Sequence, residues 1–182
     1  NRHFRIAAGT TAVFNRLRLY GGNGGGAETT DIGYGGSIRN EGTLTLRECM
    51  IADCTSPNFG GALYNTNPGT LTLERSTLYG NSATSGGGAI QQVSPNLLTL
   101  NACTVANNRA GFEAGGINAS FGPASLIHST VSGNAVVNPG SNGVGGLRGG
   151  ALTVSYCLIA GNTDANFPGI PNISPGFIYE DE

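Results

Sequence analysis

The sequence predicts an all-β protein, a right-handed parallel β-helix of about six coils, each with 26–28 residues and three short strands. Three observations support this prediction. A motif recurs at nearly constant spacing, apolar and polar residues alternate within it, and 31 of the 182 residues are Gly. Each interior Gly costs a helix about 1 kcal/mol relative to Ala, so helical repeats are excluded. Disorder is excluded because 38% of the residues are hydrophobic and recur at regular positions.

The repeat consists of blocks that end at positions 54, 81, 108, 134 and 162, in steps of 27, 27, 26 and 28 residues. A Gly-Gly pair precedes each block. The blocks are LTLRECMIADC (44–54), LTLERSTLYGN (71–81), LTLNACTVANN (98–108), ASLIHSTVSGN (124–134) and LTVSYCLIAGN (152–162). The segment FRIAAGTTAVFNRLRLYGGN (4–23) forms one more coil before them. Such self-similarity indicates a solenoid.

Within a block the pattern has a period of two, which is typical of a strand. Leu71 and Leu73 face one side, whereas Thr72 and Glu74 face the other. No helix fits between the strands, so each strand has to pair with its equivalent one repeat later, at about 4.8 Å. The usual chirality of parallel crossovers predicts a right-handed coil.

Stacking the repeats predicts columns of side chains inside the helix. The three apolar columns are Leu44/Leu71/Leu98/Ala124/Leu152, Leu46/Leu73/Leu100/Leu126/Val154 and Ile51/Leu78/Val105/Val131/Ile159. At one corner the column reads Cys54/Asn81/Asn108/Asn134/Asn162, which predicts a ladder of hydrogen-bonded amides. The same register stacks Arg47 on Glu74 and Glu48 on Arg75, which favours correct register without a catalytic role.

We expect residues 1–165 to form the β-helix and residues 166–182 to form a C-terminal tail that caps the last coil or docks on a neighbour. The tail contains three prolines, which cannot donate to a strand ladder, and the apolar residues Ile170, Ile173, Phe177 and Ile178. A β-helix has unpaired strand edges at its ends, so we also expect contacts with a protein partner or a second copy there. The chain does not begin with Met and has no signal-peptide pattern, so we expect it to be processed or part of a longer protein.

The motifs GGAL (60–63), GGAI (87–90), LYGN (78–81), VSGN (131–134) and IAGN (159–162) resemble the GGA[ILV] and FxxN repeats of polymorphic outer membrane proteins. They also resemble the wider group of bacterial secreted right-handed β-helix surface proteins. The resemblance covers roughly residues 2 to 165. It implies extracellular or surface display with an adhesive or structural use, and it supplies no catalytic residues.

Charge and hydropathy exclude two classes of partner. The net charge is −2 and no basic stripe occurs, so nucleic-acid binding is not expected. No run approaches the roughly 18 apolar residues of a membrane helix, so this segment is not expected to insert into a membrane.

The four cysteines are expected to be unpaired. Cys49, Cys103 and Cys157 share an inward column with Ser76 and Ser129 between them. Residues two coils apart are about 9.6 Å from each other, beyond the roughly 7 Å limit for a disulfide. We expect all four to be small buried residues and expect no metal or cofactor, since no close Cys/His pair exists.

Parallel β-helices also house polysaccharide lyases and hydrolases, whose chemistry needs converging carboxylates. The most plausible acids here are Glu28, Asp31, Asp53 and Glu113, which fall on different coils. His3 and His128 are far apart in the sequence. A polysaccharide-processing enzyme is therefore the alternative, and a non-catalytic protein is favoured.

A binding site is expected in the loops or on exposed aromatic residues. The candidates are Tyr34 and Phe112 in the connections, and Tyr20 and Tyr79 in an outward column where they could stack on sugar rings. We expect a non-catalytic extracellular or cell-surface module with a structural or adhesive role, part of a larger protein or assembly. A carbohydrate-binding module is a further alternative.

Overall fold

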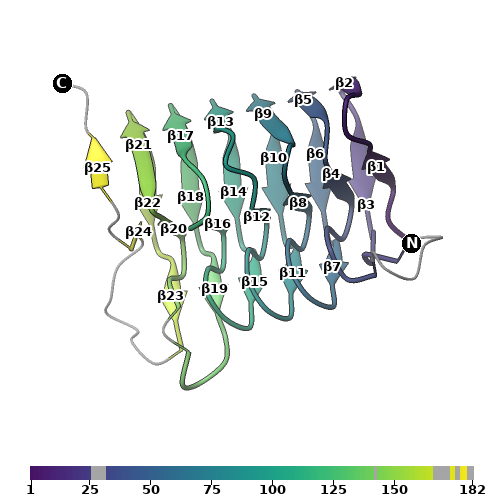
Figure 1. Ribbon diagram of the computed structural model, residues 1–182. Coiled ribbons are helices and arrows are strands. Elements are labelled where there is room, and N and C mark those ends of the chain that lie inside the picture. Colours follow the sequence, from purple (N-terminus) through teal and green to yellow (C-terminus); the bar gives the residue numbers. More distant parts are fainter. Residues whose placement is uncertain (26–31, 142, 166–172, 175–176, 180–182) are drawn as a thin grey trace.

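Four parallel sheets run side by side along the molecule, and successive coils of the chain contribute one strand to each (Figure 1). The computed structural model describes residues 1–25, 32–141, 143–165, 173–174 and 177–179. Every strand in the described part of the chain pairs in parallel with its equivalent in the adjacent coil, and no helix occurs there. The chain is therefore a parallel β-helix, as predicted.

The two largest sheets have seven strands each. Sheet A contains β1 (Phe4–Ile6), β4 (Ile38–Asn40), β8 (Leu63–Asn65), β12 (Ile90–Gln92), β16 (Ile117–Ala119), β20 (Leu147–Gly149) and β24 (Ile173–Ser174). Sheet B contains β2 (Thr11–Asn15), β5 (Thr43–Arg47), β9 (Thr70–Glu74), β13 (Leu98–Asn101), β17 (Ala124–Ile127), β21 (Ala151–Ser155) and β25 (Phe177–Tyr179).

The other two sheets are smaller. Sheet C contains β3 (Arg18–Tyr20), β6 (Met50–Ala52), β10 (Thr77–Tyr79), β14 (Thr104–Ala106), β18 (Thr130–Ser132) and β22 (Leu158–Ala160). Sheet D contains β7 (Thr55–Ser56), β11 (Ser82–Ala83), β15 (Arg109–Ala110), β19 (Ala135–Val136) and β23 (Thr163–Asp164).

Sheet D corrects the prediction of three strands per coil, because a complete coil has four. Its strands have only two residues each, which is too short for an alternating pattern to be visible in the sequence. The coil count also differs slightly from the predicted six. Five coils carry all four strands, and a first coil made of β1, β2 and β3 precedes them.

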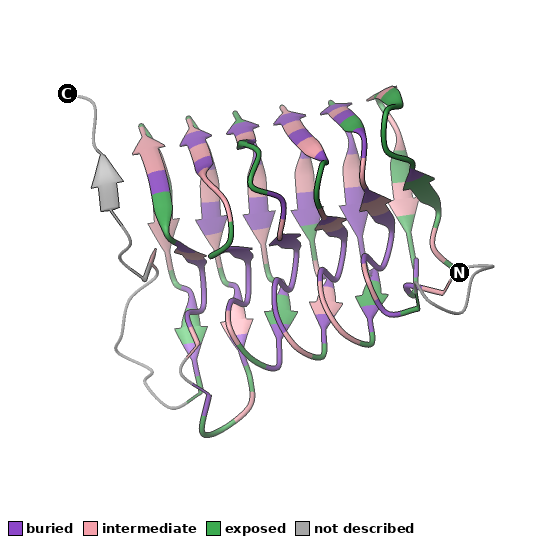
Figure 2. Cartoon of the chain, viewed as in Figure 1, coloured by how far each residue is buried: buried purple, intermediate pink, exposed green. Residues whose placement is uncertain are grey.

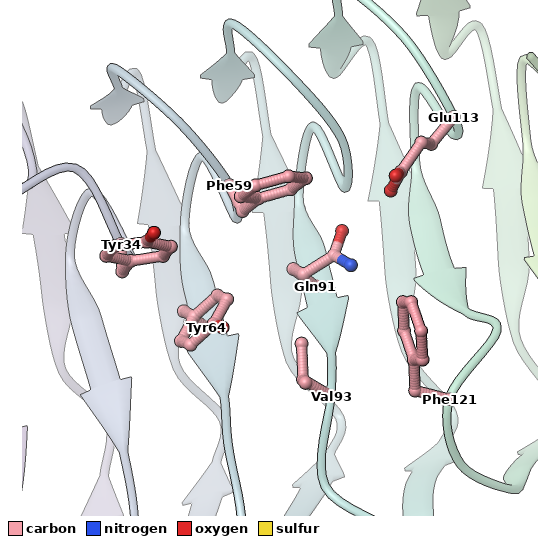
Figure 3. Close-up of a pocket in the computed structure, with 7 residues that line it drawn as sticks. All are labelled: Tyr34, Phe59, Tyr64, Gln91, Val93, Glu113 and Phe121. Atoms are coloured by element: carbon pink, nitrogen blue, oxygen red, sulfur yellow. The ribbon is translucent and has the colours of Figure 1, made fainter.

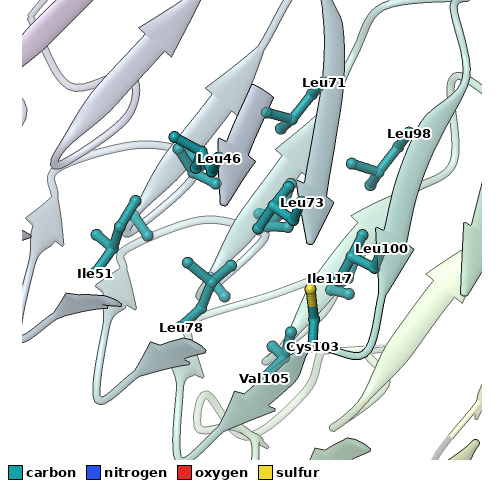
Figure 4. Close-up of a cluster of buried hydrophobic side chains, with 14 of the residues drawn as sticks. Leu46, Ile51, Leu71, Leu73, Leu78, Leu98, Leu100, Cys103, Val105 and Ile117 are labelled. Carbon is teal, nitrogen blue, oxygen red and sulfur yellow. The ribbon is translucent and has the colours of Figure 1, made fainter. Parts of the chain in front are cut away.

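The predicted register is confirmed. Leu71 pairs with Leu44 on one side and with Leu98 on the other, and the remaining residues of the three apolar columns pair in the same way. Burial alternates with exposure along these strands (Figure 2). The inward side chains form one continuous apolar cluster along the axis, with Leu73 and Leu100 at its centre (Figure 4).

The corner amide ladder is also confirmed. Nδ2 of Asn81 donates to Oδ1 of Asn108 at 2.9 Å, and the same bond links Asn108 to Asn134 and Asn134 to Asn162, both at 2.8 Å. Each Oδ1 also accepts the backbone N–H of the preceding coil's corner residue, including that of Cys54. These side chains replace the strand hydrogen bonds that the bend interrupts.

A second ladder at another corner was not predicted. Asn40 donates to Asn65 at 2.6 Å, Asn65 donates to Gln92 at 2.7 Å, and all three side chains are buried. Each amide is the fourth residue after a Gly-Gly pair, in GGSIRN, GGALYN and GGAIQQ. That shared position is the sequence pattern from which this ladder could have been found.

Sharp turns between sheets B and C carry the charged column. Arg16, Glu48 and Arg75 occupy equivalent turn positions with φ of 56°, 54° and 47°. The Glu48 carboxylate lies 2.8 Å from Nε of Arg16 and 3.2 Å from Nη2 of Arg75, so it joins three coils. Beside it Arg47 pairs with Glu74 at 2.9 Å, which confirms both predicted pairs.

The described part of the predicted tail lies at the C-terminal end of the stack (Figure 1). β24 pairs with β20 and β25 pairs with β21, so each adds one strand to its sheet. Ile173 packs against the apolar cluster, at the position where the sequence predicts a cap. Ile170, which was also assigned to the cap, lies outside the described residues.

Candidate functional site

A row of outward side chains crosses sheet A. Arg39, Tyr64, Gln91 and Asn118 are the middle residues of β4, β8, β12 and β16, and each pairs with the next in register. The flanking residues of each strand are buried in the helix interior, so the middle residues have to face outward. Four consecutive coils thus present one side chain each along a line parallel to the helix axis.

An open pocket of about 240 Å³ lies over this row. We call it the sheet A groove, and the described residues that line it are Tyr34, Phe59, Tyr64, Gln91, Val93, Glu113 and Phe121 (Figure 3). The rings of Tyr34, Phe59 and Tyr64 form one end, which we call the aromatic end. Glu113 and Phe121 lie at the other end, which we call the polar end, and Gln91 lies between the two.

The aromatic end is assembled by the connections that lead into sheet A. Tyr34 and Phe59 form an isolated parallel bridge, so their rings are stacked at 6.2 Å with an interplanar angle of 12°. The ring of Tyr64 is tilted by 56° against Tyr34 at 4.9 Å. The Arg39 guanidinium lies 5.9 Å from the centroids of both tyrosine rings, within cation–π range.

The aromatic end also contains an ion pair and a half-buried tyrosine hydroxyl. Arg39 Nε is 2.8 Å from the carboxylate of Glu41, which also pairs with Arg5 at 3.2 Å. Burial raises the pKa of the Tyr64 hydroxyl above its ordinary value, with a smaller contribution from Tyr34. Tyr64 is therefore a neutral hydroxyl on a half-buried ring at physiological pH.

The polar end is organised around Asn118. Its Nδ2 donates to the Glu113 carboxylate and to Oε1 of Gln91, the latter at 3.3 Å. Its Oδ1 accepts a hydrogen bond from the hydroxyl of Ser120 at 2.6 Å. Gln91 is only 2% exposed, and its side chain lines the groove with Oε1 held by Asn118. This amide therefore supplies a fixed donor to the groove.

The predicted ligand-binding residues are distributed over different faces. Tyr34 lines the groove, and Phe112 is 46% exposed beside Glu113 in the sequence but is not among the lining residues. Tyr20 and Tyr79 flank Ala52 in one outward column of sheet C and are 48% and 44% exposed. Tyr20 donates its hydroxyl to the sulfur of Met50 at 3.2 Å.

Sequence reasoning missed Phe59, Tyr64, Gln91, Val93 and Phe121. Tyr64 and Gln91 occupy the third position after a Gly-Gly pair, in GGALYN and GGAIQQ, where Arg39 stands in GGSIRN. Aligning that outward position across the repeats would have revealed the row. Phe59 directly precedes a Gly-Gly pair, as Tyr34 does, so the same alignment could have found it, whereas Phe121 comes from a connection whose length varies between coils.

The predicted acids do not form a set in the described structure. Glu28 and Asp31 lie outside the described residues. Asp53 follows β6 at the corner between sheets C and D, with φ of 53°, whereas Glu113 precedes β16 and lines the groove. Glu113 is thus the one carboxylate among the described lining residues.

The histidines contact neighbouring side chains of the β-helix, and the cysteines are unpaired. His128 stacks on Tyr156 at 5.2 Å, and Nδ1 of His3 is 2.9 Å from the Ser37 hydroxyl. All four thiols are free, and burial raises the pKa of Cys54 and of Cys103 above the ordinary value. The prediction that Cys157 is buried was wrong: it is half-buried, because β22 is the last strand of sheet C in the described part of the chain.

Among the described residues, no group of three His, Cys, Asp or Glu side chains is suited to a metal, and there is no helix long and apolar enough to cross a membrane. Neither family models, nor curated proteins, nor solved structures give a match to this chain.

Proposed function

We propose that this chain is a non-catalytic β-helix module that works at a cell surface or outside the cell, as a rigid adhesive scaffold. Its contact site is the sheet A groove, which binds a glycan. Contacts with a protein partner or a second copy through the coil ends stay a prediction. We place the ligand in the groove because its described lining residues combine aromatic and polar side chains.

The carrying observation is that aromatic rings and the Gln91 side-chain amide converge on one pocket. Ligand sites combine apolar and aromatic walls with a few fixed polar groups. Tyr34 and Tyr64 supply the wall, and Gln91, whose side chain is fixed by a hydrogen bond from Asn118, supplies the polar group.

The scaffold itself supports an adhesive role. Sheets A and B join every coil to the next and two buried amide ladders link several of the coils, so the outward row is held in fixed register. A preorganised row loses little entropy when a ligand binds. Hydrolysis of a glycan generally uses two carboxylates. The described lining residues supply only Glu113, which favours binding over turnover.

Binding and turnover can be measured on the same set of glycans. The purified chain is applied to an array of neutral and acidic glycans, and the glycans are incubated with it in solution and examined for cleavage products. We expect retention on the array without cleavage. Cleavage that Glu113→Gln abolishes would overturn the proposal. It would show instead that the chain is a polysaccharide-processing enzyme, the alternative considered from the sequence.

A further inference from the structure

Resting on the proposed function, we infer that the sheet A groove recognises a neutral polysaccharide that lies along the helix axis. One sugar ring contacts the tyrosine pair Tyr34 and Tyr64, and its hydroxyls face Gln91 and Glu113. The chemistry of the two ends of the groove, its charge and its size each support this ligand class.

The aromatic end suits the aliphatic face of a pyranose. Tyr34 and Tyr64 are both half-buried, and their rings contact each other at 4.9 Å, so they are held in place before a ligand arrives. The electron-rich face of an aromatic ring attracts the weakly positive C–H groups of a sugar. Phe59, stacked on Tyr34, extends this apolar wall.

The polar end suits hydroxyl groups, which both donate and accept hydrogen bonds. The Oε1 of Gln91 and the carboxylate of Glu113 both accept from Asn118, which fixes these two side chains and leaves the Gln91 amide nitrogen as a donor at the groove. A donor and a charged acceptor at the same end match a hydroxyl-rich edge.

The negative charge of the groove favours a neutral polysaccharide over an acidic one. The ionised group among the described lining residues is the Glu113 carboxylate, which repels a uronate or sulfate. Arg39 pairs with Glu41 at 2.8 Å, a carboxylate that it shares with Arg5, and Arg39 is not among the described lining residues. Arg148 follows Asn118 one coil further along the row but does not line the groove. An acidic ligand would have to bind there instead.

The volume of the groove and the direction of the outward row indicate that the pocket holds one sugar ring of a longer polysaccharide. The groove holds about 240 Å³, less than the roughly 300–1,000 Å³ of pockets that enclose a small molecule. The row from Arg39 to Asn118 crosses four coils at about 4.8 Å each. A polysaccharide therefore places one ring in the pocket and continues along the row.

The test compares neutral and acidic oligosaccharides of increasing length by calorimetric titration of the full chain. The probes are cello- and manno-oligosaccharides on one side and oligogalacturonates on the other, at low and physiological salt. We expect a neutral series to bind, with affinity that rises with length and changes little with salt. Binding of only the acidic series, weakened by Arg148→Gln, overturns the neutral ligand and leaves the proposed adhesive function standing.

The variants locate the site. Tyr64→Ala is expected to weaken binding about tenfold or more. The matched control is Tyr79→Ala on the same coil, which removes a 44% exposed tyrosine from sheet C and leaves binding unchanged. If Tyr64→Ala fails to fold, Tyr64→Phe keeps the ring and retains binding, while Gln91→Leu removes the donor and weakens it. Loss of binding on Tyr79→Ala but not on Tyr64→Ala or Gln91→Leu overturns the inference.

The result also separates the inference from the function on which it rests. Failure of both glycan series to bind overturns the ligand class and the groove as a glycan site. Cleavage of any probe overturns the non-catalytic function instead, whatever the charge of the probe.

Discussion

Nδ2 of Asn108 donates to Oδ1 of Asn134 at 2.8 Å, and neither side chain is exposed to solvent. This bond is one link in a chain of amides that runs along a corner of the helix and joins each coil to the next. Every link also satisfies a backbone N–H at the bend. The ladder therefore holds both the corner geometry and the register.

Asn108→Ala is expected to lower the free energy of unfolding by about 3 kcal/mol, because it leaves buried donors of Asn81 without an acceptor. Urea unfolding measures the change. The control is Asn101→Ala, at an exposed end of β13, which is expected to change stability by less than about 0.5 kcal/mol. Equal losses for the two variants would contradict a special role for the ladder.

Gly61→Ala is expected to destabilise the protein by about 3 kcal/mol, the upper range of overpacking effects. A Cβ at this position would lie 2.1 Å from the carbonyl oxygen of Gly88 and 2.6 Å from the backbone nitrogen of Ser82. Gly150→Ala is the matched control, since its nearest neighbour would be 3.5 Å away. Thermal melting of both variants decides the point, and a tolerated Gly61→Ala would show that the coils can separate locally.

Glu48 is expected to make the thermal stability of the protein depend on pH. Arg16, followed by Arg75, holds the pKa of this carboxyl below its ordinary value of about 4.5. A group with a lowered folded-state pKa stabilises fully above its unfolded pKa, and this contribution is lost as pH falls through the folded value. The melting-temperature gap between wild type and Glu48→Gln should be present at pH 7 and should shrink as pH falls below about 4.5 and through the lowered folded-state pKa.

The side chains of Arg16, Glu48 and Arg75 are exposed, so added salt screens their attraction. Salt should therefore reduce the melting-temperature gap between wild type and Glu48→Gln at pH 7. A gap that does not change with either pH or salt would mean that Glu48→Gln acts through the strained turn backbone and not through charge.

Four free thiols are expected on titration with a thiol reagent after denaturation without reductant. In the native protein Cys157 should react first, because it is half-buried, whereas Cys49, Cys54 and Cys103 are buried. The raised pKa of Cys54 and Cys103 further lowers their thiolate fraction. Cys157→Ser should remove the fast phase, and a fast phase that persists in this variant would contradict the assignment.

Most of the coil register could be predicted because two independent periods agree. The step of about 27 residues aligns Leu71 with Leu98, and the alternation of period two decides that both face inward. A slip of one residue would expose every leucine of a strand, so the apolar columns admit one register. The same alignment stacks Arg47 on Glu74 and Asn81 on Asn108.

The strands of sheet D and the exposure of Cys157 could not be predicted in this way. A two-residue strand such as β7 has no visible period and becomes a strand only because the neighbouring coil pairs with it. The position of Cys157 in its column is correct. Its exposure follows from the end of sheet C, which is a property of the whole stack.

The sequence by itself determined the β-helix, its apolar columns and its corner amides, because those features repeat and each repeat constrains the next. Only the tertiary structure decided the groove. Glu113 and Phe121 lie in connections of unequal length between strands, and no periodicity relates them to Tyr64 and Gln91. They meet because stacking at about 4.8 Å brings the connections of successive coils against one face of sheet A.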